Sequence, residues 1–485
     1  MNTPDLERLF NPRHVALIGA STVPGKWGFS FLFNILRGDY KGVCYPVNPR
    51  EKKILGIPCY QTVFDIPGPV DAALITTPAH RVPEIIEQCG KKGVHNVIIV
   101  SSGFSETGPE GDNLEKEVVA RAERYGIRIV GPNTMGLFSA QSNFNGIMST
   151  IEPLHGAVSM FSQSGNFGNQ MLVWGMEEGL GFDKYVSSGN EGNLTCIDFL
   201  RYFGRDNATH IVVGYLEGVN LGSEFLSVVK EISREKPIII YKGGRTERGS
   251  QAAASHTGAM TGAWKIYESA FRQTGVIQAS TAKEVVDCAK AFSAFPLPKG
   301  NRIAILTRGG GWGVITTDVC QENGLEVPPL SDGIRKKISK ILPEYWSEDN
   351  PVDLVGVTNL EPFLECLEIL AYWDGADAVI ALGGRVGPIY IFNDNEAFLE
   401  RVQLTSDSFS KMAAESSSED VKMASMAGEL MKATGKPITF VDITPREAQL
   451  KSIRELRTIS FPTPEKVVKV LKRMYDYRQY LESLP

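Results

Sequence analysis

A single histidine stands among small residues in a segment that suits close contact with an anion. His256 lies within Ala252-Ala-Ala-Ser-His-Thr-Gly-Ala-Met-Thr-Gly262, where Gly258 and Gly262 permit unusual backbone angles. An unperturbed histidine at neutral pH is largely an uncharged nucleophile. The sequence holds six histidines, and the other five are interpreted as ordinary strand-edge or exposed residues: His14, His80, His95, His155 and His210.

Two short loops could supply the anion site that a reactive histidine needs. Ser162-Gln-Ser-Gly165 and Gly309-Gly-Gly-Trp-Gly313 each follow an apolar run and precede a segment of helical period. The free N–H groups and positive end of a helix stabilise a phosphate by about 0.3 to 2 kcal/mol beyond its hydrogen bonds. The residues expected to contact phosphate are Ser162, Ser164, Gly165, Gly309, Gly310 and Gly311.

Three segments that share one order of features must position these loops. Val15–Ser21, Ala157–Gly168 and Ile303–Gly313 each join an apolar run to a small-residue loop and then to a helical pattern. This order is typical of the first strand and turn of a doubly wound α/β unit. Their starts lie about 145 residues apart, as a length of about 150 residues per domain would give. The sequence therefore predicts an α/β fold of three doubly wound domains, over residues 1–140, 150–295 and 300–465, and a C-terminal helix over 466–485.

Six further apolar runs predict buried strands. Strands this uniformly apolar are typical of parallel sheets covered by helices on both faces. The runs are Ala72–Thr77, Asn96–Ser101, Ile211–Tyr215, Pro237–Tyr241, Ala378–Leu382 and Ile438–Val441.

Composition indicates where the domains separate. Polar residues around Ser139–Pro153 and the prolines of Phe295–Gly300 predict the two boundaries. Thr463 and Pro464 predict the start of a helix that runs to about Leu484. The polar stretch Glu415–Asp420 is predicted to be an exposed loop or a break between helices.

The first glycine loop favours a phosphorylated nucleotide over NAD. Gly19-Ala-Ser21 is followed by Lys26, and the next predicted strand closes with Val47-Asn-Pro49. NAD sites usually carry an acidic residue at that strand end, whereas a lysine near the loop can pair with phosphate. Taken alone, the loop could equally be a plain structural turn.

At this point the pattern resembles a known family. The motifs are, in chain order, Gly19-Ala-Ser21, Lys26, Val47-Asn-Pro49, Thr77-Pro78, Ser102-Gly-Phe104 and Gly131-Pro-Asn-Thr-Met-Gly136. Their order and spacing are similar to those of the CoA-binding domain shared by succinyl-CoA synthetase and the NDP-forming acyl-CoA synthetases. The resemblance implies a Rossmann-like CoA-binding domain followed by two flavodoxin-like domains. It implies CoA contacts from Gly19, Ser21, Lys26, Val47, Asn48, Pro49, Thr77, Pro78, Ser102, Gly103 and Asn133.

The same resemblance implies the chemistry. The segment around His256 resembles the phosphohistidine loop of this superfamily, and Glu217 resembles the glutamate that orients the histidine. An ADP-forming acid-thiol ligase of the acetate-CoA type is implied, interconverting acyl-CoA, ADP and phosphate with carboxylic acid, CoA and ATP. No ATP-grasp unit appears, so an ATP-grasp beta subunit that binds ATP or ADP with Mg is expected as the partner in a hetero-oligomer.

Some features stay open at the level of sequence. Arg308 and Trp312 depart from the Asn-Ser-Gly-Gly-like loop of relatives and could strengthen phosphate binding or narrow the site. Ser188–Asn193 with Asp198, and Asn350–Asp353, could touch the site or be turns. A CoA sensor without ligase activity is the main alternative function. An NAD-dependent oxidoreductase is disfavoured by the missing acidic residue.

Charge and cysteine usage bound the class of protein. Lys plus Arg number 50 against 56 Asp plus Glu, a net charge of −6, which disfavours nucleic acid or anionic lipid as partners. Seven scattered cysteines without a CxxC pair predict free thiols and no metal site. The N-terminus lacks the apolar run of a signal peptide, and no stretch is long enough to span a bilayer. A cytoplasmic protein is expected.

Overall fold

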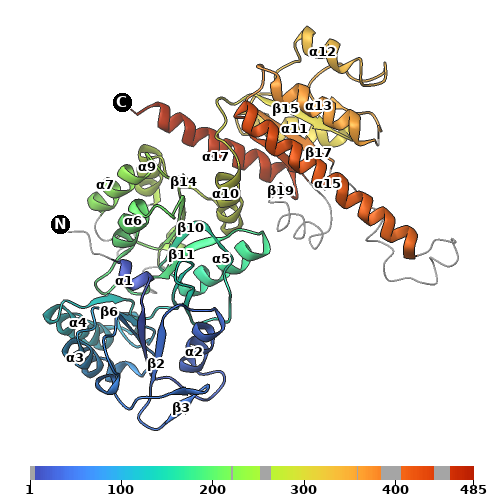
Figure 1. The fold of residues 1–485 in the computed structure, drawn as a ribbon. Helices are drawn as coiled ribbons and strands as arrows, with labels where there is room; N and C mark the ends of the chain where they lie inside the picture. The colour runs from blue at the N-terminus through green and yellow to red at the C-terminus, as the bar shows by residue number, and fades with distance from the viewer. Residues whose placement is uncertain are drawn as a thin grey trace. The chain divides into compact units, whose positions relative to one another are not determined.

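The computed structural model describes residues 6–219, 222–251, 264–357, 359–383, 406–441 and 459–484, with the backbone alone for 406–418 and 420. The chain forms two compact units, Met1–Ala289 and Lys290–Pro485. Figure 1 shows strands flanked by helices in each of them. The first unit contains two large sheets and the second contains one.

The first sheet is wholly parallel, with strand order β2-β1-β5-β6-β7. Its strands are β1 (His14–Ile18), β2 (Val43–Val47), β5 (Ala72–Ile75), β6 (Asn96–Ile99) and β7 (Arg128–Val130). The accompanying elements are α1 (Glu7–Phe10), α2 (Trp27–Arg37), α3 (Val82–Lys92), α4 (Pro109–Arg124), the short turns η1 (Val63–Asp65), η2 (Ala79–Arg81) and η3 (Ser105–Thr107), and the antiparallel pair β3 (Lys53–Ile54) and β4 (Ile57–Pro58).

Helix α3 illustrates how the local sequence specifies these elements. Proline stands in its first turn, and Gly93 closes it in the left-handed conformation with a φ of 80°. Its buried side chains include Val82, Ile85, Ile86 and Cys89, a spacing of three, four and seven residues. This spacing places them on one face, which packs on the sheet.

The second sheet has strand order β14-β13-β12-β10-β11-β8-β9. The parallel strands are β10 (His155–Ser162), β11 (Phe182–Ser187), β12 (Ile211–Leu216), β13 (Ile238–Lys242) and β14 (Ile277–Gln278). The hairpin β8 (Gly136–Ser139) and β9 (Phe144–Ile147) adds antiparallel to β11. The helices are α5 (Gly165–Glu177), α6 (Cys196–Arg205), α7 (Gly222–Ile232), α9 (Trp264–Thr274) and α10 (Ala282–Ala294).

The sheet of the second unit is also parallel, with order β16-β15-β17-β18-β19. Its strands are β15 (Ile303–Thr307), β16 (Val352–Asp353), β17 (Ala378–Leu382), β18 (Ile438–Val441) and β19 (Ser460–Phe461). Its helices are α11 (Gly310–Glu322), α12 (Asp332–Ile338), α13 (Leu360–Tyr372), α15 (Ser406–Thr434) and α17 (Pro464–Glu482). The predicted α/β class of doubly wound parallel sheets is confirmed, as are the six buried strands.

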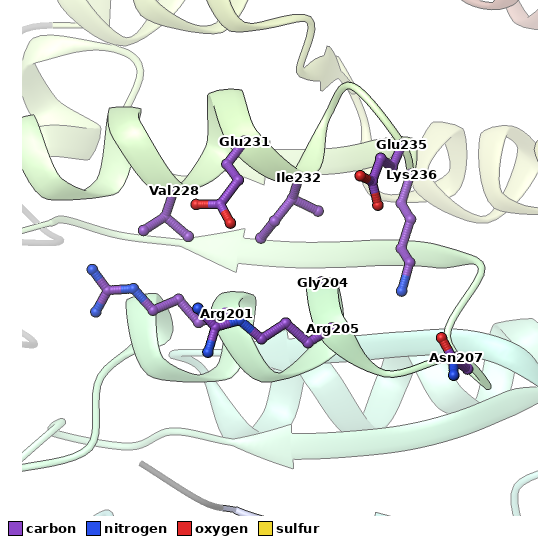
Figure 2. Close-up of a pocket in the computed structure, with 9 residues that line it drawn as sticks. All are labelled: Arg201, Gly204, Arg205, Asn207, Val228, Glu231, Ile232, Glu235 and Lys236. Atoms are coloured by element: carbon purple, nitrogen blue, oxygen red, sulfur yellow. The ribbon is translucent and has the colours of Figure 1, made fainter. Parts of the chain in front are cut away.

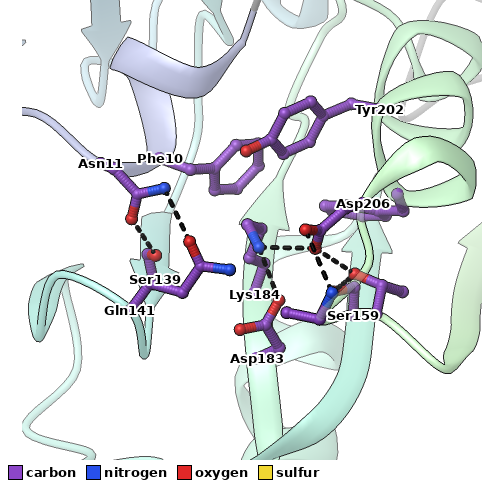
Figure 3. Close-up of polar contacts among 12 residues, drawn as sticks. Phe10, Asn11, Ser139, Gln141, Ser159, Asp183, Lys184, Tyr202 and Asp206 are labelled. Atoms are coloured by element: carbon purple, nitrogen blue, oxygen red, sulfur yellow. Dashed lines mark hydrogen bonds and ion pairs between the residues drawn. The ribbon is translucent and has the colours of Figure 1, made fainter.

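The two sheets of the first unit are joined through one hydrophobic cluster. Phe10 belongs to the same buried cluster as Phe199 and Phe203, and its ring stacks on Tyr202 with centroids 5.1 Å apart. Figure 3 shows this stack beside a second link, in which Asn11 bonds Ser139 and Gln141. The amino-terminal segment therefore packs against the second sheet as well as the first.

Two sequence predictions about connections differ from the structure. The stretch Ser139–Pro153 was predicted to separate domains, yet it contains β9, whose four residues are all buried in the second sheet. The stretch Glu415–Asp420 was predicted as a loop or break, and this is wrong because α15 runs through it without interruption. Serine costs only about 0.5 kcal/mol relative to alanine in a helix, and methionine, alanine and lysine flank the run. The predicted C-terminal helix is confirmed as α17.

All seven cysteines are free, as predicted.

Candidate functional site

The predicted nucleotide-binding residues of the first sheet gather at one edge. The strands are parallel, so their carboxyl ends meet at the same side, and the order of strands reverses between β1 and β5. Ligands of open α/β sheets bind in the crevice at such a reversal. The structure places the following residues at or just beyond those strand ends: Gly19 and Ser21 after β1, Val47, Asn48 and Pro49 at β2, Thr77 and Pro78 after β5, Ser102 and Gly103 after β6, and Asn133 after β7.

The first loop depends on two glycines that touch. Gly19 has a φ of 93°, a conformation that favours glycine. A Cβ atom on Gly28 would lie 2.0 Å from the carbonyl oxygen of Gly19, so only glycine lets α2 approach β1 this closely. Thr76 Oγ1 donates to the same carbonyl at 3.1 Å and fixes its direction.

Side chains within the loop hold its shape. Asn48 Nδ2 donates to the carbonyl oxygen of Ala20 at 2.8 Å, which ties the end of β2 to the loop after β1. Ser21 Oγ accepts from the backbone N–H of Val23 at 3.1 Å. These two predicted contact residues therefore also organise the loop itself.

Two features of this edge fit a phosphorylated ligand. Lys26 is exposed at the start of α2, where its ammonium can meet an anion. Thr77 Oγ1 is buried and has no hydrogen-bond partner within the described part of the chain. A buried hydroxyl without a partner is costly unless a ligand or water completes it.

Beyond the ends of β6 and β7, two residues have left-handed backbone conformations. Gly103 has a φ of 107° and donates its N–H to Glu106 Oε1 at 2.6 Å. Asn133, a non-glycine residue with a φ of 59°, donates from Nδ2 to Asn190 Oδ1 at 3.3 Å. Asn190 lies in the segment Ser188–Asn193, which thereby connects the two sheets of the first unit. Asn190 thus bonds a residue that is predicted to contact CoA.

The second sheet reverses its strand order between β10 and β12, and the predicted phosphate loop lies there. The buried Ser162 Oγ donates to the carbonyl oxygen of Ser164 at 2.6 Å. Ser164 is the N-cap of α5, and its hydroxyl accepts from the N–H of Phe167 at 3.4 Å. Gly165 then begins the helix. The predicted strand, turn and helix start are present at this position.

Glu217 lies directly after β12, across the strand reversal from this loop. Its side chain is buried, and Tyr215 donates its hydroxyl to Oε1 at 3.2 Å. Its backbone N–H donates to Gln163 Oε1 at 2.5 Å. The backbone at Glu217 and the start of α5 are therefore held together by a side chain of the loop.

Lys242 is the last residue of β13, and its side chain contacts the backbone of Glu217. Its ammonium is buried and donates to the carbonyl oxygens of Glu217, at 2.8 Å, and Gly243, at 2.5 Å. Burial lowers the pKa of Lys242 to about 8, although the nearby Glu217 carboxylate opposes that shift. Lys242 and Gln163 did not emerge from the sequence as site residues. Gln163 was visible only as one letter of a motif, and Lys242 as the polar end of an apolar strand.

His256 lies outside the described residues, so its geometry is not part of the structure. The described residues before and after this segment lie close to β12 and β13. Gly243 donates to the carbonyl oxygen of Leu216 at 2.8 Å, directly beside Glu217. The guanidinium of Arg245 lies over the rings of Tyr241 and Trp264, at 5.3 and 5.8 Å.

The second unit carries the other predicted phosphate loop. Gly309 caps α11, and its N–H donates to Thr307 Oγ1 at 3.1 Å, while Gly310 and Gly311 are exposed. Asp353 lies beside this helix start, since a Cβ on Gly310 would be 2.9 Å from Asp353 Oδ2. The guanidinium of Arg308 lies over the ring of Phe363 at 5.1 Å.

Asn350 has a structural role in this unit. It bonds the backbone of Ile303 and Ile305 at 2.9 Å each, which fixes the course of β15.

A pocket of about 330 Å³ lies elsewhere on the second sheet, between α6 and α7 (Figure 2). Both helices run opposite to the strands, so their carboxyl ends lie at the far edge from Glu217. Two of the basic side chains that line it already have partners within the protein. Arg201 pairs with Glu224 at 2.6 Å, and Lys236 donates to the carbonyl oxygens of Phe203 and Asp206. None of its lining residues is among those predicted for the site.

No cluster of metal-ligating side chains occurs among the residues that the structure describes. Over the same residues, no helix combines the length and apolarity that crossing a bilayer would require.

Comparisons with known proteins identify the family of these domains. Residues 13–140 match the model of a CoA binding domain, and residues 155–292 match that of a succinyl-CoA ligase like flavodoxin domain. The alpha subunit of acetate–CoA ligase [ADP-forming] I from Pyrococcus furiosus is 42% identical over 73% of this chain and 77% of its own length. That of ligase II from the same organism is 40% identical over 78% and 82%.

Longer relatives and a solved structure extend the likeness. Acetate–CoA ligase [ADP-forming] I of Archaeoglobus fulgidus is 40% identical over 78% of this chain, which spans 54% of that protein's length. The dinucleotide forming acetyl-coenzyme A synthetase 1 of Candidatus Korarchaeum cryptofilum, in complex with phosphate and ADP, superposes with a TM-score of 0.85. It is 34% identical and covers 99% of both chains.

Proposed function

Because the chain belongs to the family of ADP-forming acetate–CoA ligases, we propose that it is the CoA-binding, phosphohistidine-bearing alpha subunit of an ADP-forming acyl-CoA synthetase. The reaction interconverts acyl-CoA, ADP and phosphate with a carboxylic acid, CoA and ATP. The relatives named as alpha subunits support this assignment, since the chain covers most of their length.

The edge of the first sheet would hold CoA. The loop Gly19–Ser21 with Lys26 would take its phosphates, and the strand ends that carry Asn48, Thr77 and Asn133 would guide the pantetheine arm towards the second sheet. The exposed ammonium of Lys26 supports this placement, as does the hydroxyl of Thr77, which finds no hydrogen-bond partner among the described residues.

The chemistry would proceed in three balanced steps. A phosphate oxygen attacks the thioester carbonyl, so that the C–S bond breaks and CoA leaves as a thiolate that takes up a proton. A ring nitrogen of His256 then attacks phosphorus, and the carboxylate leaves as the P–O bond breaks. Finally an oxygen of the ADP β-phosphate attacks phosphorus, the P–N bond breaks, and ATP forms.

The protein's contribution to these steps would be mainly electrostatic. Free N–H groups at the start of α5, after Ser164, would face the phosphoryl oxygens. Glu217 would accept a hydrogen bond from the imidazole and so fix which ring nitrogen reacts. Gly309–Gly311 would supply the second anion site.

One observation carries this proposal. Glu217 and the start of α5 lie on the two sides of the strand reversal between β10 and β12, held together by Gln163 at 2.5 Å. The segment with His256 follows β13, whose end bonds the backbone at Glu217. These contacts bring the proposed orienting carboxylate and the proposed anion site to one edge, and the strand that precedes the His256 segment ends beside them.

The transfer to ADP would need a partner. We propose an ATP-grasp beta subunit, with ATP or ADP and Mg²⁺ bound there, in a hetero-oligomer with this chain. The free thiols are consistent with a cytoplasmic location.

Phosphorylation tests the function directly. Incubation with acetyl-CoA and labelled phosphate, or with the partner and labelled ATP, is expected to give a protein-bound label that is acid-labile and base-stable. His256→Ala should abolish the label, and His210→Ala, an exposed histidine at the opposite strand end, should keep it. Label that persists in His256→Ala would contradict the proposal. A screen of carboxylic acids with the partner, following phosphate release, then identifies the acid.

A further inference from the structure

Gln163 uses its whole side-chain amide to join two neighbouring strands. Its Oε1 accepts from the backbone N–H groups of Glu217, at 2.5 Å, and Gly218, at 3.2 Å. Its Nε2 donates to the carbonyl oxygen of Gly218 at 2.9 Å and to Glu191 Oε1 at 3.1 Å. The backbone N–H of Gln163 also donates to the carbonyl oxygen of Tyr215 at 3.3 Å. Few side chains could replace these bonds, because the amide must donate on one side and accept on the other.

Glu191 determines which way that amide faces. Burial raises the pKa of Glu191 to about 7. Above that pH its carboxylate is ionised and cannot donate, so only the NH₂ group of Gln163 can point towards it. The same Oε1 atom accepts from Ser188 Oγ at 2.9 Å and from the backbone N–H of Cys196, the first residue of α6, at 3.2 Å. One carboxylate oxygen therefore accepts from three donors, which lie after β10, after β11 and at the start of α6.

The backbone conformation of Glu191 indicates that the surrounding contacts hold this residue in place. Glu191 has a φ of 60°, and it is a non-glycine residue in the left-handed region. Such a conformation costs about 1 kcal/mol or more and persists where surrounding contacts require it. Gly189, two residues earlier, also lies in the left-handed region, with a φ of 63°.

We propose that Gln163 and Glu191 form a positioning pair that holds the phosphate loop of α5 and the Glu217 carboxylate in one fixed geometry. The inference rests on the function proposed above and adds two residues to it. Neither side chain needs to touch the phosphoryl group. Gln163 links the residue after β10 to the residues after β12, and Glu191 keeps its amide from turning over. A misplacement of about 1 Å at a reacting centre can cost about 100-fold in rate.

An isosteric change tests the pair. Gln163→Glu keeps the shape of the side chain but removes its donor and places a second carboxylate against Glu191. Two carboxylates so close cannot both ionise, and Asp198 on α6 adds a further negative charge near Glu191, so the variant is expected to worsen as the pH rises. We expect the rate of His256 phosphorylation, measured with the partner and ATP, to fall about 100-fold at pH 8 and less at pH 6.

Exchanging the two residues provides the rescue. In Gln163→Glu/Glu191→Gln the amide of residue 191 can donate to the new carboxylate, so at least about 10-fold of the lost rate at pH 8 should return. Glu191→Gln alone should slow phosphorylation by about 10-fold. Residue 191 could then donate as well as accept, so the amide of Gln163 would no longer be held in one orientation. The dissociation constant for CoA, which binds at the first sheet, should stay within about twofold in all three variants.

A matched control is available on α3. Gln88 Nε2 donates to Glu84 Oε1 at 3.3 Å, an exposed glutamine and glutamate pair far from this site in the chain. Gln88→Glu should leave phosphorylation unchanged at both pH values.

The outcomes separate the two proposals. A wild-type protein that takes no label on His256 would overturn the function itself. A labelled wild type with a Gln163→Glu variant that reacts at the wild-type rate at both pH values would overturn the positioning pair. Slowing without rescue by the exchange would also overturn it, because the loss would then not come from the contact between residues 163 and 191.

Discussion

The ammonium of Lys242 lies 2.8 Å from the backbone carbonyl oxygen of Glu217, in the interior of the second sheet. The ring of Tyr267 covers it with its centroid 4.7 Å from Nζ. A buried ammonium keeps its charge only where carbonyl dipoles and aromatic faces replace water. The strand that precedes the His256 segment is thus fixed by a charge to the residue that follows β12.

Replacing Lys242 should change how stability depends on pH. Burial lowers the folded-state pKa to about 8 from an ordinary value of 10.5. Between these values the unfolded chain binds more protons than the folded one, so the free energy of unfolding of the wild type should rise as the pH increases from about 8 to about 10.5. Urea denaturation of the wild type and Lys242→Met at pH 7.5 and pH 10 checks this.

The test compares how the free energy of unfolding changes with pH in the wild type and in Lys242→Met. Lys242→Met should lack this rise, whereas Lys230→Met, at a position on α7, should behave as the wild type does. Parallel pH curves for the wild type and Lys242→Met would show that the ammonium is not disfavoured by burial.

Removing the charge of Glu217 should slow phosphorylation of His256. A neutral amide cannot stabilise an imidazole that develops positive charge, and the NH₂ group of Gln would favour the wrong tautomer of the ring. We expect Glu217→Gln to lower the single-turnover rate by about 100-fold. Glu231→Gln, an exposed glutamate on α7, is the matched control. Equal rates for both variants would remove Glu217 from the proposed site.

The sequence predicted those parts of the fold that local pattern determines. Apolar runs such as Ala378–Leu382 became buried strands because a parallel sheet covered on both faces admits little else. The helix start at Pro464 was equally local. The serine-rich run Glu415–Asp420 misled because polarity was interpreted as a break, although helix propensity there is adequate.

The candidate site divides in the same way. The position of Ser164 at the start of α5 could be predicted because a loop motif marks it. Lys242 and Glu191 could not, because their roles come from contacts across strands. Glu191 lies 28 residues along the chain from Gln163, and their pairing depends on the order of strands in the sheet. Strand order is a property of the whole domain rather than of any short segment.

The close approach of Gly28 to Gly19 predicts a steric effect on CoA binding. A methyl group at residue 28 would have to displace the carbonyl oxygen of Gly19, which lies only 2.0 Å from the place of the new Cβ. Overpacking of this kind costs about 1 to 3 kcal/mol. Gly28→Ala should therefore lower the free energy of unfolding by that amount and weaken CoA binding about 10-fold or more, as isothermal titration would show. Gly222→Ala, where a Cβ meets nothing within 4 Å, should do neither.

The first and second sheets of the first unit meet near a buried ionic group that can be tested on its own. Lys184 is fully buried, and its ammonium bonds Asp183 at 2.5 Å and Asp206 at 2.6 Å (Figure 3). Burial raises the pKa of Asp183. It would also raise that of Asp206, but the bonds from Lys184 and Thr209 lower it instead. The lysine therefore compensates two carboxylates at once.

Removing that lysine should destabilise the first unit more than removing the whole ionic group. Lys184→Met leaves two carboxylates close together without a counter-charge, and breaking a buried ion pair in this way costs about 3 to 5 kcal/mol. The triple variant Lys184→Met/Asp183→Asn/Asp206→Asn carries no buried charge and should recover at least half of the loss. Chemical denaturation at pH 7 measures both. If the triple variant were less stable than Lys184→Met, the carboxylates would be stabilised by groups other than this ammonium.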